Sequence, residues 1–291
     1  MPEEVSSASE LPKDFQSYVK QTGEVPGAFS DAVLERVRSE ASGIPTQPIE
    51  PQPEPLWSWQ AGVLVWLASV ACLFALSFVA AVIGTIYLHM RGQALTPEVI
   101  ESSVAFAIFN IVSVLPAHLL SLLIAWSVVT RFGKRPFLAT MGWKWHPYFK
   151  WFHCVCFVLL MIGFALLVAK FIPNRQTPFD HLLKLVMAAK LGRVALFLAV
   201  VGSAPFQEEV IYRGVLFPGL QGKFGTIWAV VIVSLIFGGV HIPQYWPSYQ
   251  TITVIMTLSV GLTLVRAYTK SILPTFVIHL LFNLVGFALG N

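Results

Sequence analysis

Residues 193–221 read RVALFLAVVGSAPFQEEVIYRGVLFPGLQ, a stretch that is apolar over most of its length. It is longer than the roughly 20 apolar residues that a helix needs to cross a bilayer. Beyond its first residue, Arg193, three charged side chains nevertheless lie inside it, namely Glu208, Glu209 and Arg213. A charge within a membrane helix is energetically costly, so such residues indicate a functional site by default. The stretch therefore predicts a membrane-spanning helix that carries chemistry.

The amino-acid composition of the 291-residue chain is typical of a membrane protein. Hydrophobic residues make up 56% of the chain and charged residues only 12%, whereas a soluble domain has about 25% charged residues. Residues 1–56 have a net charge of −6 and residues 57–291 a net charge of +10. Basic residues in membrane-protein loops lie at lipid headgroups and set the orientation. This accounts for the positive charge, and we expect no nucleic-acid partner.

Seven segments are long and apolar enough to be predicted as spanning helices. They cover residues 59–88, 102–130, 150–171, 193–221, 226–246, 248–266 and 271–290. An eighth segment, 179–190, is short and amphipathic; we interpret it as an interfacial helix, with a short span as the alternative. The predicted fold class is all-α, a polytopic integral membrane helix bundle of about seven to eight spans.

The polar residues 1–56 are predicted to form a flexible extension, and residues 57–291 the membrane-embedded domain. The extension is rich in proline, which favours an extended and semi-rigid chain, and an amphipathic helix is predicted at 29–41. Loop 131–150 carries five basic residues, which predicts a cytoplasmic position for this loop and for the extension. Loop 171–193 is also basic and conflicts with simple alternation. We expect a multi-pass protein of a bacterial cell membrane.

The two adjacent glutamates are predicted to have different roles. Glu209 and Arg213 are four residues apart, so they share a helical face and can form an ion pair. Glu208 points about 100° away from that face and has no such partner. This difference favours a structural role for Glu209 and a chemical role for Glu208. The alternative is that both glutamates only brace the bundle.

Four more residues in later spans complete the candidate site. A turn is predicted at residues 222–225, and Glu208 and His241 lie roughly 16 residues on either side of it, which places both at one depth in a helical hairpin. Phe237 lies one turn before His241 and is predicted to cover the same face. His279 and Asn283, four residues apart, can both donate to one point, as a developing oxyanion requires. The alternative for this pair is bonding between neighbouring helices.

These signatures, in this order, resemble the pattern EExxxR, FxxxH and HxxxN of the CPBP family of intramembrane proteases. That family includes the type II CAAX prenyl endopeptidases and the bacterial Abi proteins. The resemblance covers roughly residues 100–290, and the 1–56 extension lies outside it. The matching residues are Glu208, Glu209, Arg213, Phe237, His241, His279 and Asn283.

The resemblance implies a metal-independent endopeptidase that cleaves near the C-terminus of a membrane-associated or lipidated, CAAX-type peptide. Glu208 and His241 would activate the water, and His279 and Asn283 would hold the oxyanion. The remaining motif residues would support the site, and no cofactor would be needed.

Three alternatives stay open at this point. Glu208, His241 and His279 are possible zinc ligands, although the chain has no HExxH pair. A catalytically inactive membrane scaffold is the second alternative, and a proton-coupled transporter is the third. The absence of an evident internal repeat disfavours a transporter built from inverted repeats. The expected partners are a peptide substrate and the lipid bilayer, and the sequence leaves the oligomeric state open.

Overall fold

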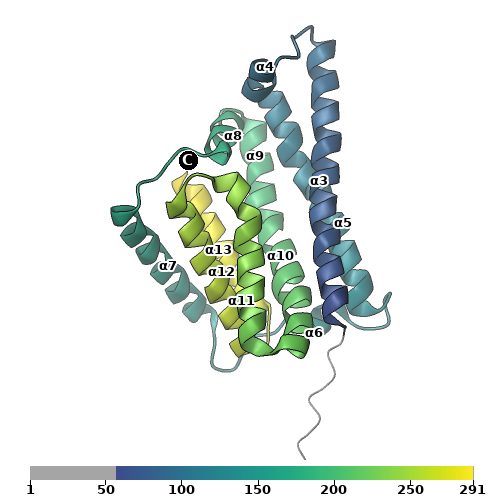
Figure 1. Cartoon of the computed structure of the whole chain (residues 1–291), viewed down its shortest axis with the longest axis vertical. Helices are drawn as coiled ribbons and strands as arrows, with labels where there is room; N and C mark the ends of the chain where they lie inside the picture. Colours follow the sequence, from purple (N-terminus) through teal and green to yellow (C-terminus); the bar gives the residue numbers. More distant parts are fainter. Residues whose placement is uncertain (1–56, 291) are drawn as a thin grey trace, which may run out of the picture. The chain divides into compact units, whose positions relative to one another are not determined.

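The computed structural model describes residues 57–290, and its regular secondary structure is entirely helical (Figure 1). The predicted extension 1–56, with its helix at 29–41, lies outside the described residues. The helices are α3 (Trp59–Met90), α4 (Pro97–Ser102), α5 (Val104–Thr130), α6 (Phe137–Thr140), α7 (Trp151–Phe171), α8 (Pro178–Met187), α9 (Lys190–Leu196), the π-helix η2 (Phe197–Ser203), α10 (Ala204–Glu208), the π-helix η3 (Glu209–Leu216), α11 (Phe217–Tyr245), α12 (Tyr249–Thr269) and α13 (Leu273–Leu289).

Five helical stretches within residues 57–290 are long and apolar enough to cross a membrane: α3, α5, α7, the run Lys190–Tyr245 and α12. They indicate a multi-pass integral membrane protein. The expected number of seven to eight spans differs from this number of stretches for two reasons. The run Lys190–Tyr245 contains both predicted segments 193–221 and 226–246, which the bend at Gly225 separates, and 271–290 becomes α13, whose 17 residues are at the lower limit of the lengths that cross a bilayer.

The run Lys190–Tyr245 is bent at Gly225, whose backbone angles of φ 79° and ψ 169° are not helical. Glycine is essentially the only residue found in this region of backbone space. Beyond the bend α11 returns beside η3, so that the ring of Phe237 lies 5.0 Å from that of Tyr212 (Figure 1). The turn predicted at residues 222–225 is therefore present.

Replacing Gly225 with alanine is expected to destabilise the protein by about 1–3 kcal/mol, because a residue with a Cβ is strained at these angles. Nothing lies within 4 Å of the added Cβ, so the effect comes from the backbone alone. Gly239→Ala is the matched control, because Gly239 lies in the same helix with equally open space and no positive φ. Alanine there is expected to be neutral or stabilising. Thermal unfolding in detergent measures both; a Gly225→Ala midpoint as high as that of Gly239→Ala would contradict the prediction.

Helix α8 bears on the two interpretations of residues 179–190. It has ten residues, and at 1.5 Å per residue it is about 15 Å long, half of the roughly 30 Å hydrocarbon core. Its first turn is fixed by a capping box, in which Thr177 and Asp180 each accept a hydrogen bond from the other's backbone N–H. Apolar side chains of α8 pack against α5 and α9. This length argues against the alternative of a short span, and the interfacial position of the helix stays a prediction.

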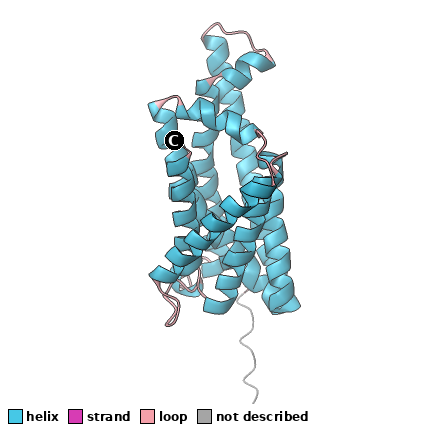
Figure 2. Cartoon of the chain, turned by 90° about the vertical axis from the view of Figure 1, so that its left-hand side faces the viewer, coloured by secondary structure: helices cyan, strands magenta, loops and turns pink. Residues whose placement is uncertain are grey.

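The packing of the bundle leaves apolar side chains both inside and outside. One buried cluster joins α3, α5, η3 and α11, a second joins α7, α12 and α13, and a third joins α5, α8 and α9. On α3 the side chains of Phe74 and Phe78 are 75% and 71% exposed. A helix that is hydrophobic all round belongs in a membrane or in the core of a large protein. In Figure 2 the long helices lie side by side, with loops at the two ends.

Candidate active site

The adjacent carboxylates Glu208 and Glu209 lie where two π-helical segments meet the short helix α10. At the end of η2 the backbone N–H of Ala204 bonds to the carbonyl of Ala199, five residues back instead of four. The same spacing recurs after η3, where Phe217 bonds to Tyr212. π-helical turns within α-helices occur frequently at functional sites. The local backbone therefore singles out this stretch independently of its charges.

Glu209 and Arg213 form the ion pair that their spacing predicts. Arg213 Nη1 lies 3.2 Å from Glu209 Oε1, and both side chains are almost completely buried. Breaking such a buried pair leaves an uncompensated charge, which is strongly destabilising. The pair is therefore a fixed part of the bundle.

The guanidinium of Arg213 is held by α12 and α11 as well. Its Nε donates to Thr263 Oγ1 at 3.3 Å, and its Nη2 lies 3.1 Å from the carbonyl and 3.0 Å from the hydroxyl oxygen of Ser259. The ring of Phe237 lies against it, 4.5 Å from Arg213 Cζ, as a cation–π contact. Hydrogen bonds and a ring contact thus fix the guanidinium, and with it the orientation of Glu209.

His279 lies between the two glutamates. Its Nδ1 is 3.0 Å from Glu209 Oε1 and its Nε2 is 3.6 Å from Glu208 Oε2. The two carboxylates differ in access, because the side chain of Glu208 is 20% exposed and that of Glu209 only 1%. The arrangement gives one accessible carboxylate and one buried carboxylate on opposite nitrogens of the same imidazole.

Phe237 connects the two histidines of the site. Its ring centroid lies 4.8 Å from that of His241 and 6.0 Å from that of His279. Nδ1 of His241 lies 2.7 Å from the Phe237 carbonyl oxygen, which can only accept, so Nδ1 carries the proton and Nε2 is free to accept one. Within residues 57–290, no hydrogen bond or ion pair joins His241 directly to Glu208.

Asn283 lies one turn after His279 on α13, but its observed bond differs from the expected one. Its Nδ2 donates to the carbonyl of Val200 in η2 at 2.9 Å. An amide nitrogen has two hydrogens, so a second one remains. The sequence predicts donation toward a point shared with His279, and the structure instead shows a bond between two helices, which is the alternative stated for this pair.

Several residues of the site were not predicted. Ser259 and Thr263 hold Arg213, and Arg266 Nε donates to the Arg213 carbonyl at 2.9 Å. Ser259, Thr263 and Arg266 are spaced four and three residues apart, which places them on one face of a helix. This polar face in an otherwise apolar segment is the signal in the sequence that could have identified them. Nδ1 of the buried His118 lies 2.9 Å from Ser203 Oγ, and nothing near His118 in the sequence points to that partner.

The proposed zinc ligands do not form a metal-binding group. Among residues 57–290, no cluster of three or more His, Cys, Asp or Glu side chains is arranged to hold a metal ion. Nδ1 of His279 contacts Glu209 and its Nε2 faces Glu208, so neither nitrogen of this ring is open to a metal ion. The arrangement of the described residues therefore does not fit a zinc centre.

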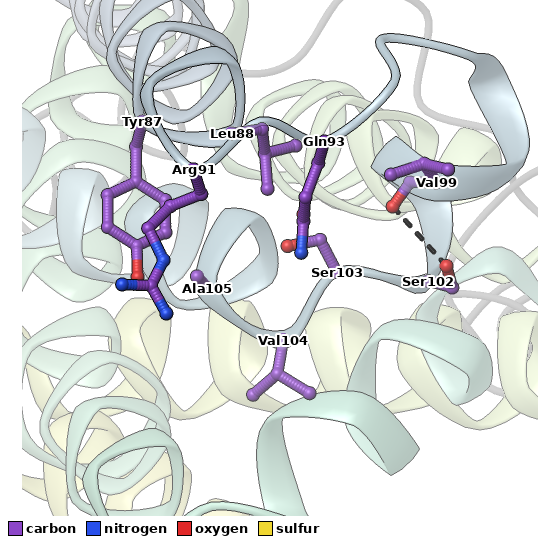
Figure 3. Close-up of a pocket in the computed structure, with 9 residues that line it drawn as sticks. All are labelled: Tyr87, Leu88, Arg91, Gln93, Val99, Ser102, Ser103, Val104 and Ala105. Atoms are coloured by element: carbon purple, nitrogen blue, oxygen red, sulfur yellow. Dashed lines mark hydrogen bonds between the residues drawn. The ribbon is translucent and has the colours of Figure 1, made fainter.

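A cavity of about 360 Å³ lies elsewhere, between the end of α3, α4 and the start of α5 (Figure 3). Its lining includes the side chains of Arg91, Gln93, Ser102 and Ser103, and none of the motif residues. The cavity therefore is not part of the candidate site.

Comparison with known proteins singles out the same part of the chain. Residues 190–285 match the family model described as type II CAAX prenyl endopeptidase Rce1-like. All seven motif residues lie inside this range. The match is shorter than the range 100–290 over which the sequence resembles that family, because α5 and α7 lie outside it. No curated protein and no solved structure matches the chain.

Proposed function

Because residues 190–285 are an Rce1-like domain of the type II CAAX prenyl endopeptidase family, we propose that the protein is an intramembrane endopeptidase. Its proposed substrate is a membrane-associated or lipidated peptide, of CAAX type in the first instance, which is cut near its C-terminus. The observation that carries this proposal is the placement of His279 between the accessible Glu208 and the buried Glu209. Such a site has a base, a fixed imidazole and a supporting ion pair.

In the proposed reaction Glu208 accepts a proton from a water molecule as the water oxygen bonds to the peptide carbonyl carbon. His241 is the second group that can accept or return this proton. The charge that develops on the carbonyl oxygen is stabilised by donation from His279 and from the second amide hydrogen of Asn283, since the first is used on Val200. When the C–N bond breaks, the leaving amine takes up a proton and the shortened peptide leaves as a carboxylate.

The charges of the cluster support this assignment of protons. Arg213 keeps Glu209 ionised, so Nδ1 of His279 donates to Glu209. The proposed donation to an oxyanion requires a proton on Nε2 of His279 as well, and with that proton the four groups Glu208, Glu209, Arg213 and His279 would have no net charge. A buried cluster without net charge avoids the cost of an uncompensated charge. The doubly protonated ring is also the state in which Nε2 can donate to an oxyanion.

We further propose that the end of the bundle with loop 131–150 faces the cytoplasm of a bacterial cell, because basic loops are retained there. Figure 1 shows α6, which belongs to this loop, at the same end as the start of α3 and the turn of α11, where Gly219 closely approaches the backbone of Ser58. Residues 1–56 precede α3 and are proposed to be cytoplasmic too.

The test is incubation of the purified protein in mild detergent with a synthetic peptide that ends in a farnesylated CAAX sequence. We expect a C-terminally shortened product by mass spectrometry, at a rate that EDTA and 1,10-phenanthroline leave unchanged. The same peptide without the farnesyl group, and an unlipidated membrane-spanning peptide, show which feature is recognised. If the protein cuts none of the three peptides, the proposed function is overturned. If a chelator abolishes the cleavage and added zinc restores it, the metal-independent mechanism is overturned.

A further inference from the structure

The backbone of η2 lacks one hydrogen bond because Pro205 has no N–H group. At the end of η2 the bonds run five residues back, as the bond from Ala204 to the carbonyl of Ala199 shows. The next donor would belong to residue 205, and if the five-residue spacing continues its acceptor would be the carbonyl of Val200. Proline cannot make this bond, and an unpaired carbonyl within a membrane is costly.

Asn283 occupies the place of the missing donor. Its Nδ2 lies 2.9 Å from the Val200 carbonyl oxygen, although the two residues are 83 positions apart in the sequence. Asn283 lies one turn after His279 on α13, and Pro205 lies three residues before Glu208 on α10. The bond therefore joins the segment that carries the proposed base to the helix that carries the imidazole.

We propose that Asn283 is a positioning residue whose amide replaces the N–H that Pro205 lacks, and so fixes η2 and α10 against α13. The second amide hydrogen stays available to the oxyanion, so this role is additional to the one in the reaction. The link to catalysis rests on the proposed function, whereas the bond itself is testable without a substrate.

The test is a double-mutant cycle of Pro205→Ala and Asn283→Leu, measured by thermal unfolding of the full-length protein in detergent. Leucine is similar in size to asparagine but has no donor, and alanine at position 205 restores the N–H that can bond to Val200. With Pro205 present, Asn283→Leu is expected to lower the midpoint by about 2–4 °C. In the Pro205→Ala background the loss is expected to be much smaller. Equal losses in the two backgrounds overturn the proposal.

Asn110→Leu is the matched control for this cycle. Nδ2 of Asn110 donates to the Phe106 carbonyl within its own helix α5 at 3.0 Å, so its loss is expected to be the same with either residue at position 205. The proposal is overturned if Pro205→Ala reduces the loss caused by Asn110→Leu as much as it reduces the loss caused by Asn283→Leu. The alanine would then change the stability of the whole bundle and not one hydrogen bond. If Asn283→Leu does not fold, Asn283→Ser takes its place in the same cycle.

The same variants give a catalytic measurement. Asn283→Leu is expected to lower kcat for the cleaved peptide with KM unchanged, and Pro205→Ala is expected to restore part of that loss. The restoration is partial because the new N–H fixes α10 but does not donate to the oxyanion. A kcat that Pro205→Ala does not restore overturns the positioning role. If the wild type cuts no peptide, the proposed function fails, while the midpoints still decide whether Asn283 replaces the missing donor.

Discussion

A Glu208→Gln variant is expected to cut peptide about 10³-fold more slowly than the wild type, because glutamine cannot accept the proton of the attacking water. Stability is expected to change little, since the Glu208 side chain is 20% exposed and its ion-pair contact within residues 57–290, with His279 Nε2, is long at 3.6 Å. The measurement is kcat for the farnesylated peptide, together with the thermal midpoint of the same preparation. Loss of rate at an unchanged midpoint separates a chemical role from a structural one.

Glu101→Gln is the control for this substitution, because Glu101 is an exposed glutamate just before α5 and lies outside the candidate site. It is expected to cut peptide at the wild-type rate. A Glu208→Gln variant that retains most of the activity contradicts the assignment of the base and directs attention to His241. The transporter alternative predicts a different result, in which Glu208→Gln abolishes proton-dependent uptake into vesicles.

The part of the site that the sequence predicts is the part set by spacing along one helix. Glu209 and Arg213 are four apart and do pair, because the helical repeat places them on one face whatever surrounds them. The hairpin about Gly225 is similar: Arg213 lies 12 residues before it and Phe237 12 residues after it, and the two side chains are in contact. Contacts that follow from helical spacing alone can thus be predicted without knowing how the rest of the chain is bent.

The part that the sequence does not predict depends on tertiary contacts and on irregular backbone. The partner of Asn283 is the Val200 carbonyl, which we propose is left free because Pro205 has no N–H to bond to it. Hydropathy cannot detect a π-helical turn, since the composition of the segment is the same in either form.

Arg213→Met is expected to cost about 3–5 kcal/mol of stability, because it leaves the carboxylate of Glu209 buried without its partner. Methionine fills much of the volume but provides none of the hydrogen bonds to Glu209 and Ser259. A loss of this size is a large part of the 5–15 kcal/mol typical of a folded protein. We expect a strongly lowered thermal midpoint in detergent, or no folded protein at all.

The double variant Arg213→Met/Glu209→Gln distinguishes a lost charge pair from a poorly filled site. Once Glu209 is neutral no buried charge is left unpaired, so part of the stability lost in Arg213→Met is expected to return. Arg193→Met is the control, since Arg193 is exposed and donates to the carbonyl of Met187 at the surface; it is expected to unfold at the wild-type midpoint. If the double variant is no more stable than Arg213→Met, Arg213 stabilises the bundle mainly through α12 and Phe237, and compensation of Glu209 is the smaller effect.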